Sequence, residues 1–316
     1  MPNAISYATN GRHPLPRIDL QKAVWPIVAI LSAVGLWGGS FATMRYALRT
    51  LDPWSVMWLR MAIALAALMP FAGRLRRSGY QRGDWRLLVP MVLFQPCLYF
   101  WLESRALCLT TSSQAGVIAA SVPLMVSVGA YLLLSEPMGV RSILGLTLSM
   151  AGVAGLTLMQ GGQGQAVNPY LGNMLELGAM VCAAANMLAI KKLCARYSSW
   201  TLTALQVAAG TIFFLPGLWF LIKSPPAHCT VSLVATLVFL GLFVTLGAFG
   251  LYNWGMSRMP AGKASIFINL VPVIAVLVGW LAMDETLTPA QCLAALTVMG
   301  GVWMSQKSRN RLTGNG

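Results

Sequence analysis

Three ionisable side chains interrupt long apolar runs of this sequence: Arg60, Glu103 and Glu176. In a membrane-spanning helix such a residue costs about 3 kcal/mol or more unless it is paired or hydrated. Each is therefore a candidate for binding a proton, an ion or a charged solute. At the 1.5 Å rise of a helix, Arg60 and Glu176 lie about 10 Å and about 9 Å into their runs, and Glu103 lies near the end of its own. All three fall in the same half of the membrane, so an ion pair between Arg60 and one glutamate is the structural alternative.

Glu103 belongs to a polar stripe, because Tyr99 precedes it by four residues and Gln95 by eight. Residues at this spacing share one helix face, and lipid cannot satisfy their polar groups. The stripe is therefore predicted to face a cavity, with Tyr99 and Glu103 as substrate-binding residues and Glu103 as a proton site. Glu176 is predicted to bind a substrate amine or a proton, with pairing to Arg60 as its alternative. Arg60 itself is expected to be a structural partner or anchor at the periphery of the cavity.

Two prolines are predicted to kink their helices, Pro123 and Pro272. A proline has no N–H to donate, so Pro272 leaves the carbonyl of Ile268 free. Asn269, three residues before Pro272, would complete a polar patch for a zwitterion or a hydroxyl. The alternative for Asn269 is an ordinary hydrogen bond between helices.

Aromatic side chains add to the candidate binding residues. Trp37 lies in the middle of the first apolar run, and Tyr252 lies toward the end of the eighth. Together with Tyr99, they could stack on an aromatic or cationic ligand. Glu136 and Glu285 follow apolar runs directly, and we expect them to form hydrogen bonds at turns and helix ends.

The composition indicates an integral membrane protein. Of 316 residues, 57% are hydrophobic and only 9% are charged, whereas soluble domains carry about 25% charged residues. The net charge of +14 does not indicate a nucleic-acid partner, because the basic residues lie in short clusters between apolar runs. The six cysteines show no paired spacing, so no disulfide, metal site or cofactor is predicted.

Ten apolar runs approach the roughly 20 residues that a spanning helix needs. The sequence therefore predicts an all-α integral membrane fold with ten transmembrane helices. The runs cover residues 23–45, 54–73, 85–107, 112–134, 139–159, 170–192, 199–222, 230–253, 262–283 and 288–306.

The two halves of the chain resemble each other. A shift of 149 positions places Pro123 on Pro272 and Glu136 on Glu285, and a shift of 146 places Trp54 on Trp200. A five-helix unit enters and leaves on opposite sides of the membrane, so its second copy must be inverted. Inverted five-helix repeats are typical of secondary transporters.

The three ionisable residues within the apolar runs are not duplicated, because none of them matches a like residue in the other half. The counterparts of Arg60, Glu103 and Glu176 are, in order, Gln206, Tyr252 and Ile30. The scaffold is thus symmetric while the charged set is not, which suggests that one half holds the substrate or the coupling ion.

The repeat pattern predicts five segments along the chain. They are an N-terminal tail (1–22), a first repeat of helices 1 to 5 (23–159), a linker (160–169), a second repeat of helices 6 to 10 (170–306) and a C-terminal tail (307–316).

The basic residues predict the orientation. With the N-terminus inside, the outer loops hold only Arg45, Arg49, Arg105 and Lys223 among the 22 lysines and arginines. Arg60 lies within a span, and the other seventeen lie in cytoplasmic segments. This asymmetry follows the positive-inside rule, so both tails are predicted to be cytoplasmic.

The sequence resembles the EamA-type drug/metabolite transporter family over residues 23 to 306. The resemblance rests on the following motifs: GLWGGSFATMRYAL (35–48), Arg60 in WLRMAIA, ESRAL (103–107), Pro123 and Pro272 each followed by SE or DE at its helix end, SMAGVAG (149–155) and VMGGV (298–302). It implies ten helices in two EamA repeats and alternating access through a cavity lined mainly by helices 1, 3, 4, 6, 8 and 9.

The expected function is secondary transport of a small metabolite across the inner membrane. We expect export of amino acids or related amines by a monomer or homodimer whose partners are its substrate and membrane lipid. If Glu103 or Glu176 is a proton-coupling carboxylate, the mechanism is exchange of protons against the substrate. The alternative is an uncoupled facilitator or channel-like permease for a nucleoside, a quaternary amine or a drug. No nucleotide-binding loop and no catalytic constellation occur in the sequence, so neither an ATP-driven pump nor an enzyme is expected.

Overall fold

The computed structural model describes residues 20–74, 80–134, 140–158, 166–226, 229–258 and 267–312. In these ranges the chain is all-helical and contains no strand. The predicted all-α class is therefore confirmed.

The helices follow the predicted apolar runs closely, although several runs are divided. Their bounds are α1 (Leu20–Leu48), α2 (Pro53–Leu68), η1 (Met69–Arg74), α3 (Trp85–Val92), η2 (Leu93–Leu98), α4 (Tyr99–Leu109), α5 (Ser112–Ala119), α6 (Val122–Leu134), α7 (Val140–Leu158), α8 (Pro169–Leu193), α9 (Ser199–Phe213), α10 (Pro216–Lys223), α11 (Val231–Val238), η3 (Phe239–Ala248), α12 (Phe249–Met256), η4 (Phe267–Leu270), α14 (Val271–Met283) and α15 (Pro289–Leu312).

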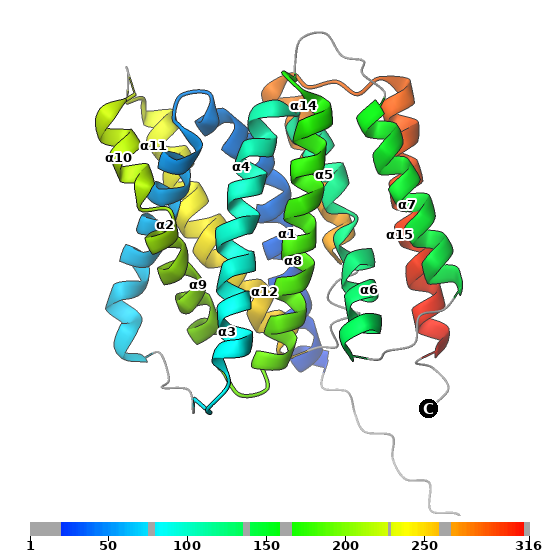
Figure 1. Cartoon of the computed structure of the whole chain (residues 1–316), viewed down its shortest axis with the longest axis horizontal. Coiled ribbons are helices and arrows are strands. Elements are labelled where there is room, and N and C mark those ends of the chain that lie inside the picture. The colour runs from blue at the N-terminus through cyan, green and yellow to red at the C-terminus, as the bar shows by residue number, and fades with distance from the viewer. Residues whose placement is uncertain are drawn as a thin grey trace, which may run out of the picture.

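The helices stand side by side, and α1 begins on the same side of the molecule on which α15 ends (Figure 1). α7 and α15 pack against each other at one edge of the bundle (Figure 1). α1 lies toward the centre and contacts α4, α5, α12 and α14. The core of buried apolar residues thus forms around α1.

Six helical stretches in the described ranges are long and apolar enough to cross a membrane. A seventh is added if α9 and α10, which meet at a 48° bend, form one span. α14 is apolar but shorter, at 13 residues. The protein therefore has several apolar spans, while the predicted total of ten is not confirmed.

The apolar run 112–134 is predicted to form one continuous helix, but the structure divides it into two helices. α5 ends at Ala119 and α6 begins at Val122, one residue before Pro123. The run 262–283 is divided in the same way, because η4 precedes α14 and Pro272 lies in the first turn of α14. Since proline fits the first turn of a helix but disrupts an interior turn, both helices restart at their prolines. The two restarts, at Val122 and Val271, lie 149 positions apart.

The third and eighth runs each contain a π-helical segment, which the sequence analysis does not predict. η2 divides the third run, and Gln95 within it has an extended backbone (φ −146°, ψ 120°). η3 divides the eighth run. A shift of 149 positions places residues 93–98 on 242–247, inside η3. Segments of this kind occur frequently at functional sites.

At one end of the bundle, the carboxylate of Glu285 caps the beginning of α5. The backbone N–H groups of Ser112 and Ser113 donate to it over 3.0 and 2.9 Å, and both hydroxyls donate over 2.7 Å. Arg45, near the end of α1, forms an ion pair with the same carboxylate. Helix-end hydrogen bonding by Glu285 is therefore confirmed, at the start of α5, while Glu136 lies outside the described residues.

At the opposite end, Asp84 joins the two halves of the chain. Its carboxylate accepts hydrogen bonds from Arg196 Nη2 and from the Tyr197 hydroxyl, each over 2.7 Å. The backbone N–H of Gln81 donates to it over 3.0 Å. Burial would raise the pKa of Asp84, but the hydrogen bonds from Gln81 and Tyr197, helped by Arg196, hold it below its ordinary value.

Candidate functional site

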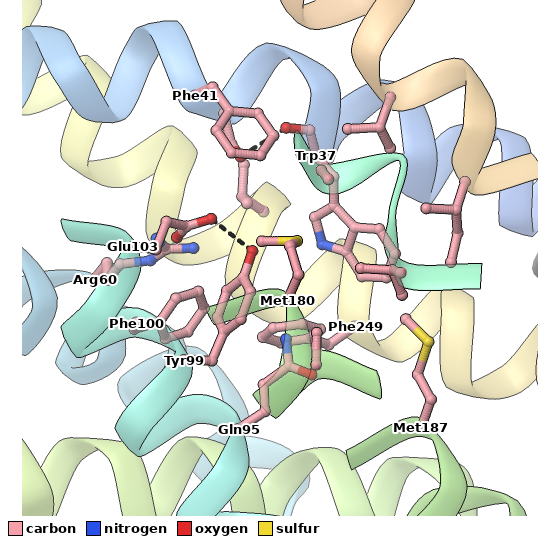
Figure 2. A pocket seen from close by; sticks show the side chains of 17 residues that line it. Trp37, Phe41, Arg60, Gln95, Tyr99, Phe100, Glu103, Met180, Met187 and Phe249 are labelled. Carbon is pink, nitrogen blue, oxygen red and sulfur yellow. Dashed lines mark hydrogen bonds between the residues drawn. The ribbon is translucent and has the colours of Figure 1, made fainter. Parts of the chain in front are cut away.

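A cavity of about 50 Å³ lies between the two halves, large enough for a few water molecules (Figure 2). Its walls come from both halves: Trp37, Ser40, Phe41, Arg60, Gln95, Tyr99, Phe100, Glu103, Ala119, Val122, Met180, Ala183, Met187, Val244, Phe249, Ile268 and Val271. These residues belong to the predicted helices 1, 3, 4, 6, 8 and 9, and Arg60 adds helix 2. We call this space the central cavity.

The predicted polar stripe lies on the wall of the central cavity. Gln95, Tyr99 and Glu103 all line it, as their spacing predicts. The Tyr99 hydroxyl donates a hydrogen bond of 2.5 Å to Glu103 Oε1 (Figure 2). Glu103 therefore already accepts one hydrogen bond, from a tyrosine one turn earlier on the same helix, before any ligand binds.

Arg60 lies at the cavity rather than at the periphery, with only 1% of its surface exposed. Its Nε donates to Thr245 Oγ1 over 2.8 Å and its Nη1 contacts Met44 Sδ at 3.4 Å. The guanidinium lies over the Phe100 ring, 4.2 Å from the centroid (Figure 2). Among the described residues, no salt bridge joins Arg60 to Glu103 or Glu176. The guanidinium and the Glu103 carboxyl group still lie close enough for their charges to interact, so the pairing of Arg60 with Glu103 stays a prediction.

Glu176 is completely buried, and neither oxygen of its carboxyl group has a hydrogen-bond partner. It lies on α8, which packs along α4, and Gly178 of α8 lies against Leu102 of α4. The charges of Glu176 and Glu103 are close enough to interact. Glu176 does not line the central cavity, so only Glu103 of the two carboxyl groups lies on its wall.

The aromatic candidates divide between two spaces. Trp37 lines the central cavity and packs against Phe249 and Tyr252, with ring centroids 5.8 and 4.8 Å away. Tyr252 is not on that wall but lines a smaller cavity beside it. Asn269 lies in η4, and its side chain is outside the described residues.

Three amides form a cluster near the cavity: Gln95, Asn186 and Gln206. The sequence predicts Gln95 on the cavity wall, but it does not predict the contacts of Gln95 with Asn186 and Gln206. Asn186 Nδ2 donates to Gln95 Oε1 over 2.7 Å, and Gln206 Nε2 donates to Asn186 Oδ1 over 3.1 Å. A usable signal exists, because Asn186 and Gln206 each interrupt a stretch of apolar residues.

The sequence profile described as the EamA-like transporter family matches this chain twice, over residues 24–158 and 170–306. The chain belongs to the EamA-like transporter family. The double match also shows that the chain carries two EamA units. With its apolar helices, it is a multi-pass membrane protein of that family.

Relatives within the family extend over almost the whole chain. An uncharacterized transporter, YcxC of Bacillus subtilis (strain 168), is 28% identical over 291 residues, covering 87% of this chain and 90% of its own. A probable terminal-alkyne amino-acid exporter of Streptantibioticus cattleyicolor is 26% identical over 297 residues, covering 91% and 94%. One solved crystal structure matches with a TM-score of 0.60 at 20% identity, covering 93% of this chain and 99% of that chain. This last likeness concerns the fold alone.

Proposed function

We propose that this EamA-family protein exports amino acids or related small amines across the bacterial inner membrane by alternating access, in exchange for protons. The proposal includes ten spans in two inverted repeats and cytoplasmic tails at both ends of the chain. The observation that carries it is Glu176, a fully buried carboxyl group without a hydrogen-bond partner.

An ionised Glu176 would be a charge without a partner inside the membrane, at a cost of about 3 kcal/mol or more. A proton on the carboxyl group removes that cost, and so does an ammonium group brought beside it. Glu103 stands nearby on the cavity wall, with the Tyr99 hydroxyl bonded to it. Since neighbouring carboxylates repel each other, a cation that binds at one of them favours proton loss from the other. This linkage is what exchange of a proton for an amine requires.

The chemistry of the wall supports this substrate class. Glu103 on the wall favours an ammonium group, and the rings of Trp37 and Tyr99 offer faces to a cation. The relative named as a probable amino-acid exporter supports the same class. A thermal-shift screen over amino acids, nucleosides and quaternary amines tests it, and binding of another class alone would overturn it.

The coupling is tested by Glu103→Gln and Glu176→Gln in proteoliposomes. Both substitutions keep the size of the side chain but remove the titrating group. We expect transport driven by a pH gradient to be lost, while exchange of labelled for unlabelled substrate continues. Asp52→Asn is the matched control, because Asp52 caps α2 outside the cavity by accepting from the Trp54 N–H.

A second candidate is an uncoupled permease for a quaternary amine, a nucleoside or a drug. The aromatic side of the cavity favours it, because Trp37, Phe100 and Phe249 could hold a ring or a permanent cation without any proton. Retained gradient-driven transport in both glutamine variants would support this candidate and contradict proton exchange.

A further inference from the structure

A second cavity of about 10 Å³ adjoins the central cavity. The two spaces share four wall residues: Trp37, Gln95, Met187 and Phe249. Figure 2 shows these four together, with Gln95 and Met187 at the lower edge of the view. The far wall of the second cavity includes Asn186 and Gln206. A space of this size holds a single water-sized group.

Gln206 lines this cavity, and its amide oxygen accepts no hydrogen bond. It is 1% exposed, and its Oε1 has no hydrogen-bond partner. Its Nε2 donates to the Gln95 carbonyl over 3.0 Å and to Asn186 Oδ1 over 3.1 Å. Turning the amide over would place its oxygen against two other oxygens, so the network fixes the assignment. The second cavity is therefore lined by an acceptor that lacks a donor.

The second cavity lies in the other half of the membrane from the two glutamates. Gln206 is seven residues from the start of α9, and Asn186 is seven residues from the end of α8, or about 10 Å at a helical rise. Glu176 is likewise seven residues from the start of α8, at its opposite end. The amides and the carboxyl groups thus lie on either side of the midplane.

Gln206 also occupies the position that corresponds to Arg60 in the other half of the chain. Arg60 of α2 bonds to Thr245 in the π-helical segment η3, and Gln206 of α9 bonds to Gln95 in the π-helical segment η2. Each side chain reaches from its own half into the π-helical segment of the other half. The two cavities are therefore built on corresponding contacts.

We propose that Gln95, Asn186 and Gln206 form a second substrate-binding position, the amide station, which takes a hydroxyl or ammonium group of the transported solute on the cytoplasmic side of the central cavity. This inference rests on the proposed function and its orientation. An amide oxygen binds a donor without carrying a charge, so an ammonium group can bind there while Glu103 and Glu176 hold a proton. The same oxygen repels a carboxylate, so the station prefers the amine end of a solute.

Cysteine labelling in membrane vesicles tests the station without a transported substrate. The six native cysteines are first replaced, and a melting curve checks that the protein remains folded. Gln206→Cys is then treated with 2-aminoethyl methanethiosulfonate, a small ammonium reagent, in inside-out vesicles. The matched control is Val207→Cys, the next residue on α9, which is equally buried but packs with Ala64 and Leu68.

We expect Gln206→Cys to react about tenfold faster than Val207→Cys, because thiol reactivity follows exposure to the reagent. After correction for reactivity toward a free thiol, the ammonium reagent should react about tenfold faster than the 2-sulfonatoethyl reagent, because the remaining amide oxygens favour a cation. Asn186→Cys should behave in the same way, and it is the second variant if Gln206→Cys does not fold.

The amide station is overturned if both variants react no faster than Val207→Cys, or if the sulfonate reagent reacts faster than the ammonium reagent. Water alone in the second cavity would give labelling without a charge preference, which also overturns the proposal. Because labelling requires no transport, failure of the amino-acid screen would overturn the proposed function and leave this result standing.

Discussion

Two buried glutamates of this protein have opposite surroundings. Glu285 accepts four hydrogen bonds from Ser112 and Ser113 and pairs with Arg45, whereas Glu176 accepts none. A buried charge is stable when it is paired and hydrogen-bonded, and costly when it is not. Glu285 is therefore suited to hold helices together, and Glu176 is suited to exchange its partner.

Glu285 should make the stability of the protein depend on pH. Burial would raise the pKa of its carboxyl group, but the hydrogen bonds from Ser112 and Ser113 outweigh burial and place the pKa below its ordinary value. Because the pKa of Glu285 is depressed in the folded state, its ionised carboxylate stabilises the protein fully above the unfolded-state pKa of about 4.3. It is lost as the pH falls from there through the folded-state pKa.

The measurement is the melting temperature at pH 7 and at pH 3. Glu285→Ala leaves Arg45 without this carboxylate and should cost about 3 kcal/mol at pH 7. The difference between Glu285→Ala and the wild type should be smaller at pH 3 than at pH 7, because the stabilisation from the ionised carboxylate is lost as the pH falls through its depressed pKa. A difference that stays constant with pH would contradict the assignment. Asp52→Asn is the control, since it removes a cap at the start of α2 that does not involve Arg45.

At this scale, the sequence reveals side chains that share a helix face but not those that meet across helices. The stripe of Gln95, Tyr99 and Glu103 follows from spacing alone, and all three residues line the central cavity. The contact of Arg60 with Phe100 depends on how α2 packs against α4, and no local pattern encodes that packing.

Among the helices, α7 and α15 form a pair at one edge of the bundle (Figure 1). Neither contributes a described residue to the wall of the central cavity. Gly152 of α7 lies against the backbone of α15, where an added Cβ would come within 2.7 Å of the Val298 nitrogen and 2.8 Å of the Ala294 oxygen. The pair therefore depends on the absence of a side chain at position 152.

Gly152→Ala should destabilise the protein without changing its transport kinetics. The added methyl group meets backbone atoms that cannot turn away, so we expect a loss of about 1 to 3 kcal/mol. Gly300→Ala on α15 is the matched control, because an added Cβ there meets nothing within 4 Å. Melting curves measure the loss, and transport per folded molecule should be unchanged. Equal melting temperatures for the two variants would contradict the close packing.

The helix boundaries show where prediction from sequence fails at this scale. Prolines mark the restarts at Val122 and Val271, so those breaks follow from the residue types. The π-helical segment η3 lies in a continuous apolar run, FLGLFVTLGA, and no proline interrupts it. η3 packs against α1 and α2, and the sequence of the run does not encode that packing.

For the whole molecule, the two ends of the bundle are held by different polar contacts. At one end Glu285 joins α1 to α5, and beneath it α5 packs tightly on α14, where a Cβ added at Gly116 would lie 2.2 Å from the Cβ of Ala275. At the other end Asp84 joins the two halves through Arg196 and Tyr197. In the proposed orientation, the end with Glu285 faces outward and is shut in this conformation.

Alternating access requires the end with Glu285 to open once in every cycle. A covalent link between Arg45→Cys and Glu285→Cys should therefore stop transport, whereas each single variant should continue to transport. We expect a short bis-methanethiosulfonate crosslinker to abolish uptake into proteoliposomes, and a reductant to restore it. In a cysteine-free background, the same link should leave the amide station open to labelling from the cytoplasmic side, because only the outer end is fixed. Undiminished transport by the linked protein would show that this end does not have to open. The proposal that the outer gate opens between Arg45 and Glu285 would then be wrong.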